Sequence, residues 1–208
     1  APYLFDAISA EALRRGLGDF KEQGLSNTAW AFAKAGQAAP YLFDAISTEA
    51  LRLGLRAFTE QELSNTAWAF ATAGHAAPHL FDAISAQALR RGLGGFKEQG
   101  LSNTAWAFAT AGQAAPYLFD AISAQALRWG LGGFMEQGLS NTAWAFATAG
   151  HAAPYLFDAI SAEALRQGLG GFTEQNLSNT AWAFAKAGHA APYLFDAISA
   201  EALRRGLG

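Results

Sequence analysis

The chain has no cysteine and only one methionine among its 208 residues. The absence of cysteine excludes a disulfide framework and any zinc site built on thiolates. Charged residues are scarce at 15%, and apolar stretches are interrupted every few residues, so no segment predicts a membrane span. We find no signal-peptide or transit-peptide pattern. Because 51% of the residues are hydrophobic, the composition predicts a folded chain rather than a disordered one.

What the sequence does contain is one unit of 38 residues in tandem. Self-similarity at such a period predicts a solenoid, in which each unit buries its apolar face against its neighbours. We therefore expect an all-α, right-handed α-solenoid that forms a single array over residues 1–208, without an internal domain boundary. Repeats 1 to 5 and half repeat 6 are residues 1–38, 39–76, 77–114, 115–152, 153–190 and 191–208.

Each repeat is predicted to contain two antiparallel helices. In repeat 1 the first helix covers about residues 2–15, with Pro at its first position and Gly16 after its end. The second helix covers about residues 22–35, with Gly36 as its left-handed stop. Repeat 2 adds a T-x-x-E capping box at the start of its second helix, formed by Thr59 and Glu62.

Helical periodicity assigns two faces to the second helix. The apolar face of repeat 1 consists of Leu25, Ala29, Phe32 and Ala33. The opposite face, expected to be exposed, consists of Gly24, Asn27, Ala31 and Lys34. Residues at the 24 and 34 positions differ between repeats. This variation is explained either by a lack of constraint or by a surface that recognises one base per repeat, as in other solenoids.

Three sets of residues on that face are candidate RNA-binding positions. An Asn side chain can pair with a base edge through both its donor and its acceptor, although an Asn ladder between adjacent helices is the structural alternative. Lys34 and Lys186 could contact phosphate, and a solvated helix end is the plainer explanation. The Asn set is Asn27, Asn65, Asn103, Asn141 and Asn179. The set at position 24 is Gly24, Glu62, Gly100, Gly138 and Asn176.

Two further rows have a structural explanation that we favour. The Arg14 row, one arginine per repeat, could hold a phosphate backbone, but pairing with Asp or Glu of the next repeat is preferred. The Trp30 row could stack bases. Its position beside the apolar face instead favours packing between repeats, with Trp106 in the core. The members of the Trp30 row are Trp30, Trp68, Trp106, Trp144 and Trp182.

Enzymatic chemistry has little support in the sequence. The four histidines share no metal-ligand spacing among the repeats, and Pro78 separates His75 from His79. Asp6 and Glu11 recur once per repeat and are not expected to converge as a catalytic pair. Residues 168–171 read Gly-Leu-Gly-Gly but lack the Lys-Ser/Thr that completes a phosphate loop. We expect no enzyme, no cofactor, no metal and no small-molecule substrate.

The repeat resembles a known family. Its length, the segment FTEQELSNTAWAFATAGH (Phe58–His75) and the following P-x-L-F-D-A-I-S are similar to octotricopeptide repeats along the whole chain. The resemblance implies a helical-pair solenoid of algal or protist organelles, chloroplast or mitochondrion, that binds RNA during its stabilisation, processing or translation. The string from Ser26 to Gly36 also resembles the helix of pentatricopeptide repeats that lines their RNA groove. By that likeness the second helices would line the concave side.

These observations lead to two functional hypotheses. The first is a modular single-stranded RNA-binding protein that takes about one nucleotide per repeat. The second is a protein-binding or structural scaffold, either a designed array or part of an organellar assembly. Phosphate binding requires clustered Lys and Arg, whereas this chain has a net charge of −3 and a pI near 5.8. Charge is uneven, however, because only residues 77–114 form a repeat with net positive charge.

Overall fold

The computed structural model describes residues 2–206, and within them the chain forms eleven α-helices, two short 3₁₀ helices and no strand. The first helices of the repeats are α1 (Pro2–Arg15), α3 (Pro40–Leu53), α5 (Pro78–Arg91), α7 (Pro116–Trp129), α9 (Pro154–Gln167) and α11 (Pro192–Arg204). The second helices are α2 (Glu22–Lys34), α4 (Glu60–Thr72), α6 (Glu98–Thr110), α8 (Glu136–Ala149) and α10 (Glu174–Lys186). The 3₁₀ helices η1 (Leu93–Gly95) and η2 (Leu169–Gly171) lie between the two helices of a repeat. The prediction of a two-helix repeat is confirmed.

Glycine and proline set the ends of these helices. Each first helix has Pro at its first position, where the missing N–H needs no partner. After α3 the backbone turns at Gly54, whose φ of 71° is a conformation that side chains with a Cβ rarely adopt. The second helix of repeat 1 ends at Lys34, one residue earlier than predicted. Gly36 follows with φ 63°, which lets the Gln37 N–H donate to the Phe32 carbonyl at 3.0 Å.

The starts of the second helices differ between repeats. In α4 the hydroxyl of Thr59 accepts from the N–H of Glu62 at 3.2 Å. The carboxylate of Glu62 accepts in turn from the N–H of Thr59 at 2.8 Å, so the predicted capping box is confirmed. Lys21, Lys97 and Met135 occupy the same position in α2, α6 and α8 without a side-chain cap. Local capping is therefore not what makes the repeat helical, and packing between neighbours must supply most of the stabilisation.

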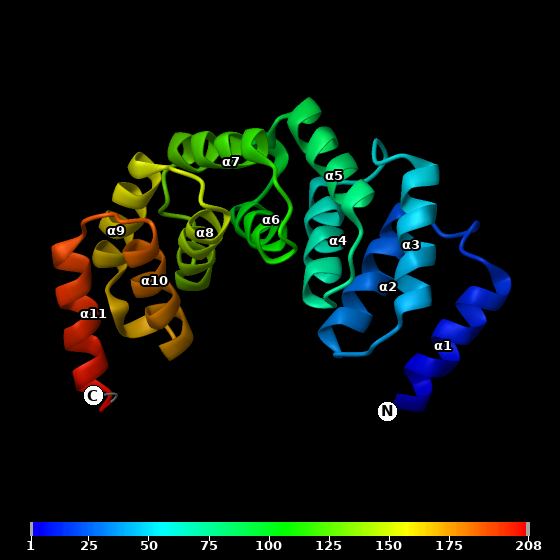
Figure 1. The fold of residues 1–208 in the computed structure, drawn as a ribbon, viewed down its shortest axis with the longest axis horizontal. Coiled ribbons are helices and arrows are strands. Elements are labelled where there is room, and N and C mark those ends of the chain that lie inside the picture. Colours follow the sequence, from blue (N-terminus) through cyan, green and yellow to red (C-terminus); the bar gives the residue numbers. More distant parts are fainter. Residues whose placement is uncertain (1, 207–208) are drawn as a thin grey trace.

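The helices form two layers of an arch (Figure 1). The odd-numbered first helices lie on its outer side and the even-numbered second helices on its inner side. Consecutive second helices pack along their length, whereas consecutive first helices approach each other at fewer positions. The array is thus an α-solenoid whose inner layer is tighter than its outer layer, and the second helices line the concave side.

The core runs between the two layers from repeat to repeat. In repeat 2 the rings of Phe43 and Phe70 meet edge to face with centroids 5.0 Å apart, and the other full repeats contain the same pair. Leu42, Phe43 and Ile46 of α3 are at most 1% exposed. Such burial stabilises each side chain by roughly 1.5–3 kcal/mol. The same residues recur at each interior junction, so the core is continuous rather than divided into domains.

Helix length bears on membranes. The helices in the described residues contain at most 14 residues, whereas a bilayer span needs about 20 apolar ones. None of these helices is long and apolar enough to cross a membrane.

Candidate nucleic-acid interface

One narrow side of each second helix remains open toward the inside of the arch. In α2 this side consists of Gln23, Asn27, Trp30 and Lys34, spaced by four, three and four residues. Such spacing places side chains on one side of an α-helix. We call these positions, with their equivalents in α4, α6, α8 and α10, the inner stripe. Every member of it in the described structure is at least partly exposed.

The sides of the second helices that flank the inner stripe are buried against neighbouring second helices. Ala69, Ala107 and Ala145 are each 0% exposed. Ala183 of α10 is also 0% exposed, so the expectation that the position of Ala31 is exposed is wrong for repeats 2 to 5, and Ala31 itself is half-buried. Single-helix periodicity could not show this, because it assigns one buried face, whereas the interior second helices contact an outer-layer helix and two inner-layer neighbours.

The residues at position 24 lie at the contacts between second helices. The hydroxyl of Ser26 donates to the carbonyl of Glu62 in the next repeat at 3.3 Å, and Ser140 donates to the carbonyl of Asn176 at 3.1 Å. Asn176 is 8% exposed, and the Glu62 carboxylate is held in its capping box. The prediction that this position flanks Asn27 on the exposed face is therefore wrong for Asn176. By contrast, Gly100 and Gly138 line grooves on the concave side together with Asn103 and Asn141. Gly24, Gly100 and Gly138 are half-buried, and a Cβ there would contact the Phe four residues earlier.

The asparagine row follows the inner stripe. Asn27 is exposed, whereas the four later asparagines, each on a helix that has a preceding second helix beside it, are half-buried. The amide of Asn179 accepts a hydrogen bond from the side chain of Gln175 at 2.7 Å within α10. That contact is within one helix, whereas the alternative of an Asn ladder requires bonds between adjacent helices. The described structure contains no side-chain hydrogen bond between asparagines of adjacent helices.

The tryptophans form a second row beside the asparagines. Their rings follow one another with centroids 6.3–6.5 Å apart and interplanar angles of 31–35°. The preferred explanation, packing between repeats, is confirmed. The expectation that Trp106 belongs to the core is not, since Trp106 is half-buried, and Trp30 and Trp182 are 42% and 45% exposed. One edge of the row faces the concave side.

A glutamine row was missed in the sequence. Gln23, Gln61, Gln99, Gln137 and Gln175 are exposed at the start of the second helices. Each lies four residues before an asparagine of the inner stripe and so on the same side of the helix. The sequence does contain a signal for this row, because the glutamine is present in all five full repeats.

Two grooves are formed where inner stripes from different repeats face each other. Groove A, of about 540 Å³, is lined by Trp30, by Asn65 and by Lys97, Gln99 and Asn103. Groove B, of about 410 Å³, is lined by Trp30 and Lys34, by Lys97 and Asn103, and by Asn141. Trp30 of repeat 1 therefore shares a groove with residues of repeats 2 to 4. The curvature of the array brings these residues to one surface although they are far apart in the sequence.

The second lysine at position 34 lies elsewhere. Lys34 and Lys186 are both exposed at the ends of their helices, as expected. Lys34 lines groove B, whereas Lys186 belongs to α10, the last second helix that the structure describes.

The Arg14 row lies on the outer layer and pairs within its own helix. Arg52 donates to Glu49 at 2.5 and 2.8 Å, and Arg166 does the same to Glu163. The prediction of pairing with the next repeat is wrong, because residues three apart on a helix are already neighbours. Hydrogen bonds from these arginines hold the pKa of Glu49 and Glu163 below the usual value. Arg14, Arg52, Arg166 and Arg204 are thus engaged with carboxylates, whereas Arg90 donates to the amide oxygen of Gln87.

Contacts between repeats in the outer layer come from the residue after that arginine. Arg205 donates to the carbonyl of Phe172 at 2.7 Å, and Gln167 donates to that of Phe134 at 2.9 Å. Arg91 reaches the carbonyls of Arg56 and Phe58 in the same manner. Each of these side chains binds the interhelix turn of the preceding repeat. Leu53 and Trp129 occupy the equivalent position in repeats 2 and 4 and have no group that can donate to both carbonyls.

The histidines take structural positions. His75, His151 and His189 each contact an aspartate of the same repeat through Nε2, at 2.8–2.9 Å. Their rings also lie 5.5–5.7 Å from the two core phenylalanines. Among the described residues, no three His, Asp or Glu side chains lie close enough together to hold a metal ion.

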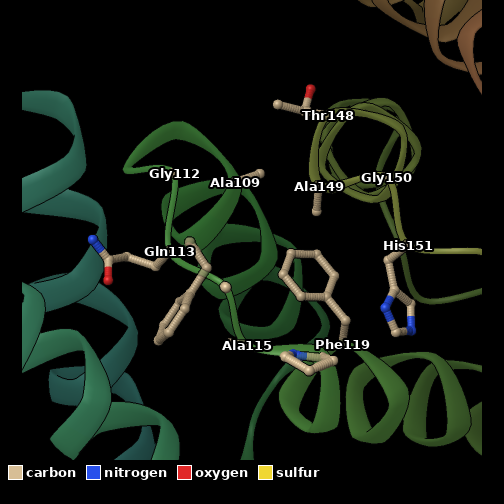
Figure 2. Close-up of a pocket in the computed structure, with 12 residues that line it drawn as sticks. Ala109, Gly112, Gln113, Ala115, Phe119, Thr148, Ala149, Gly150 and His151 are labelled. Atoms are coloured by element: carbon tan, nitrogen blue, oxygen red, sulfur yellow. The ribbon is translucent and has the colours of Figure 1, made fainter.

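A further cavity, of about 480 Å³, lies between α6, α7 and α8 (Figure 2). Phe119 and His151 lie on one side of it, and the Gln113 side chain extends on the other. Gln113 donates to the Ala111 carbonyl at 3.3 Å, and His151 contacts Asp120. Thr148 is the one other polar side chain of the lining, and the rest is mostly alanine, glycine and phenylalanine. Because Gln113 and His151 are engaged, we interpret the cavity as a packing gap between repeats 3 and 4.

A scan of the sequence against protein-family models finds no match, and a search of curated proteins finds none either.

Proposed function

We propose that the inner stripe binds single-stranded RNA, at about one nucleotide per repeat. One observation carries the proposal: the asparagine amides and the tryptophan rings form two adjacent rows on the concave side, one of each per repeat. An amide can pair with a base edge, and an exposed indole can stack on a base. A solenoid that offers the same pair once per repeat has the geometry of one-base-per-repeat recognition. The organellar setting rests on the resemblance to octotricopeptide repeats alone.

The near-identity of the repeats predicts the kind of target. Five nearly identical asparagine positions favour a nearly homopolymeric strand of about five nucleotides. With few basic residues on the concave side, affinity should be modest and should depend only weakly on salt. The cations at the second helices are Lys21, Lys34, Lys97 and Lys186.

The experiment is a binding titration of the chain with the four homopolymeric RNAs at low salt. Replacing Asn65, Asn103 and Asn141 together by Ala should weaken binding at least about tenfold, since each removed hydrogen bond contributes about 1 kcal/mol. Helicity should be retained, because Ala is a strong helix former. The control replaces Arg52, Arg90 and Arg128 on the outer layer and should change binding little. Absence of binding to all four RNAs contradicts the proposal. Loss of binding in the arginine variant alone would place the ligand on the outer layer.

A second candidate is a binding surface for an extended peptide. The spacing of 6.3–6.5 Å between successive tryptophans is close to that of two residues in an extended chain, about 6.6–6.8 Å. Asparagine amides could then pair with the peptide backbone at every second residue. This candidate is favoured if the chain binds none of the RNAs and an extended peptide library, screened against the same asparagine variant, yields ligands that require the inner stripe.

A further inference from the structure

The inner stripe repeats its asparagine and tryptophan but not its charges. Position 34 is lysine only in repeats 1 and 5, and position 21 is lysine only in repeats 1 and 3. Trp30 meets Lys34 and Lys97 in groove B, and it meets Lys97 alone of these lysines in groove A. The concave side therefore has one region, formed by repeats 1 to 4, whose chemistry differs from the rest.

Three kinds of group meet in that region. The Trp30 ring is 42% exposed and stands one helical turn before Lys34. Lys97 and Asn103 of repeat 3 line the same groove B. An indole stacks on a base, an ammonium group attracts a phosphate, and an amide pairs with a base edge. Together these groups match the base face, the base edge and the phosphate of one nucleotide.

Two carboxylates also line these grooves, Glu60 in groove A and Glu98 in groove B. Glu60 is 3.5 Å from Arg91, which draws it toward the outer layer. Glu98 lies against the backbone of Gly133 in the next repeat, so closely that a Cβ there would meet its carboxylate. Groove B is therefore lined by two lysines and one carboxylate, so positive charge is in excess there.

From these contacts we infer that grooves A and B form the primary nucleotide site of the array. One base stacks on Trp30 and is contacted at its edge by Asn103, and the adjoining phosphate lies between Lys34 and Lys97. This inference rests on the proposed RNA-binding function. It adds that binding is concentrated in repeats 1 to 4 instead of being shared equally along the five tryptophans.

The chain provides matched controls for this inference. Trp182 and Lys186 occupy in repeat 5 the positions of Trp30 and Lys34 in repeat 1. Trp182 is 45% exposed and stacks on Trp144 at 6.3 Å, just as Trp30 stacks on Trp68 at 6.3 Å. Within the described residues no second helix follows α10, so nothing equivalent to Lys97 or Asn103 faces Trp182. Substitutions at the two ends remove similar packing but should differ in binding.

The test measures affinity for the tightest-binding homopolymeric RNA, with a circular dichroism check of folding. Trp30→Ala should weaken binding about 5- to 150-fold, the range for one lost stacking contact, whereas Trp182→Ala should change it less than about threefold. Trp30→Phe keeps an aromatic ring and should restore most of the affinity. Lys34→Ala should lower the slope of log affinity against log salt by about 0.7, and Lys186→Ala should leave it unchanged.

The possible outcomes separate this inference from the proposed function. If the chain binds RNA and the substitutions in repeats 1 and 5 weaken binding equally, the primary site is wrong while the RNA-binding proposal stands. If the chain binds none of the RNAs, both are overturned. A Trp30→Phe variant that binds as weakly as Trp30→Ala would also exclude stacking as the role of this ring.

Discussion

The inner and outer layers are built from equally regular sequences but pack in opposite ways. Consecutive second helices lie along each other because their contact positions hold Ala, Ser or Gly, with Ala69, Ala107 and Ala145 completely buried. Consecutive first helices approach at fewer positions and are tied by long polar side chains such as Arg205. Close approach on one layer and wider spacing on the other bend the array. The side-chain size at the contacts thus creates the concave side that carries the candidate site.

The largest expected effect comes from enlarging a buried alanine of the inner layer. Ala107→Leu inserts a larger side chain where the residue is 0% exposed, which should destabilise the protein by about 1–3 kcal/mol or more. The matched change Ala124→Leu is on the exposed side of α7 in the outer layer and should stay within about 0.5 kcal/mol. Denaturant midpoints followed by circular dichroism compare the two. Equal effects would mean that the layers do not differ in packing.

A smaller effect is expected from the side chains that tie the outer layer. Arg91→Ala removes hydrogen bonds to the carbonyls of Arg56 and Phe58 and should cost about 1 kcal/mol, because the group is partly exposed to water. Trp129→Arg introduces the missing donor in repeat 4 and should raise the free energy of unfolding by a comparable amount, which would be seen as a higher denaturant midpoint. A Trp129→Arg variant that is less stable than the parent would show that this tryptophan already contributes equivalent packing.

The smallest expected effect is the acid dependence of the outer-layer ion pairs. Hydrogen bonds from Arg204 and then Arg205 lower the pKa of Glu201 from 4.5 to about 2. A carboxylate whose pKa is lowered by folding stabilises the folded state fully above about pH 4.5. That contribution is lost as the pH falls toward 2. Glu49 and Glu163 shift in the same direction for the same reason.

The corresponding test removes these carboxylates. Replacing Glu49, Glu163 and Glu201 by Gln should flatten the fall in urea midpoint between about pH 4.5 and 2, while the midpoint near pH 7 decreases slightly. Repeats 3 and 4 already have Gln87 and Gln125 at this position and serve as internal examples of a tolerated amide. An unchanged acid profile would assign the acid dependence to other carboxylates.

Much of the fold could be predicted because the same helix-start and helix-end signals recur in every repeat. These signals depend on short-range chemistry that can be read from the sequence. They are the prolines that begin the helices at Pro40 and Pro78, the capping box at Thr59 and the left-handed glycine at Gly36. The second helix was placed one residue too long, since the last turn before a left-handed glycine is shared between helix and cap.

The candidate site was harder to predict, because it depends on distances between repeats. A helical projection puts Gly24 and Ala31 beside Asn27, yet their equivalents Asn176 and Ala107 are buried against neighbouring second helices. The same projection places Trp30 at the edge of the core and cannot show that its ring reaches the concave side. Nor can it bring Lys97 to the groove that holds Trp30, since that proximity results from the curvature of several repeats.

The most direct measurement is photo-cross-linking of the chain to a short single-stranded RNA containing 4-thiouridine, with the cross-linked residues located by mass spectrometry. The account predicts cross-links on the second helices, concentrated at Trp30, Trp68 and Lys97. The tyrosines of the outer layer, such as Tyr117 and Tyr155 at 77% and 78% exposure, should remain unmodified. Cross-links confined to those tyrosines or to the outer arginines, or none at low salt, would contradict it.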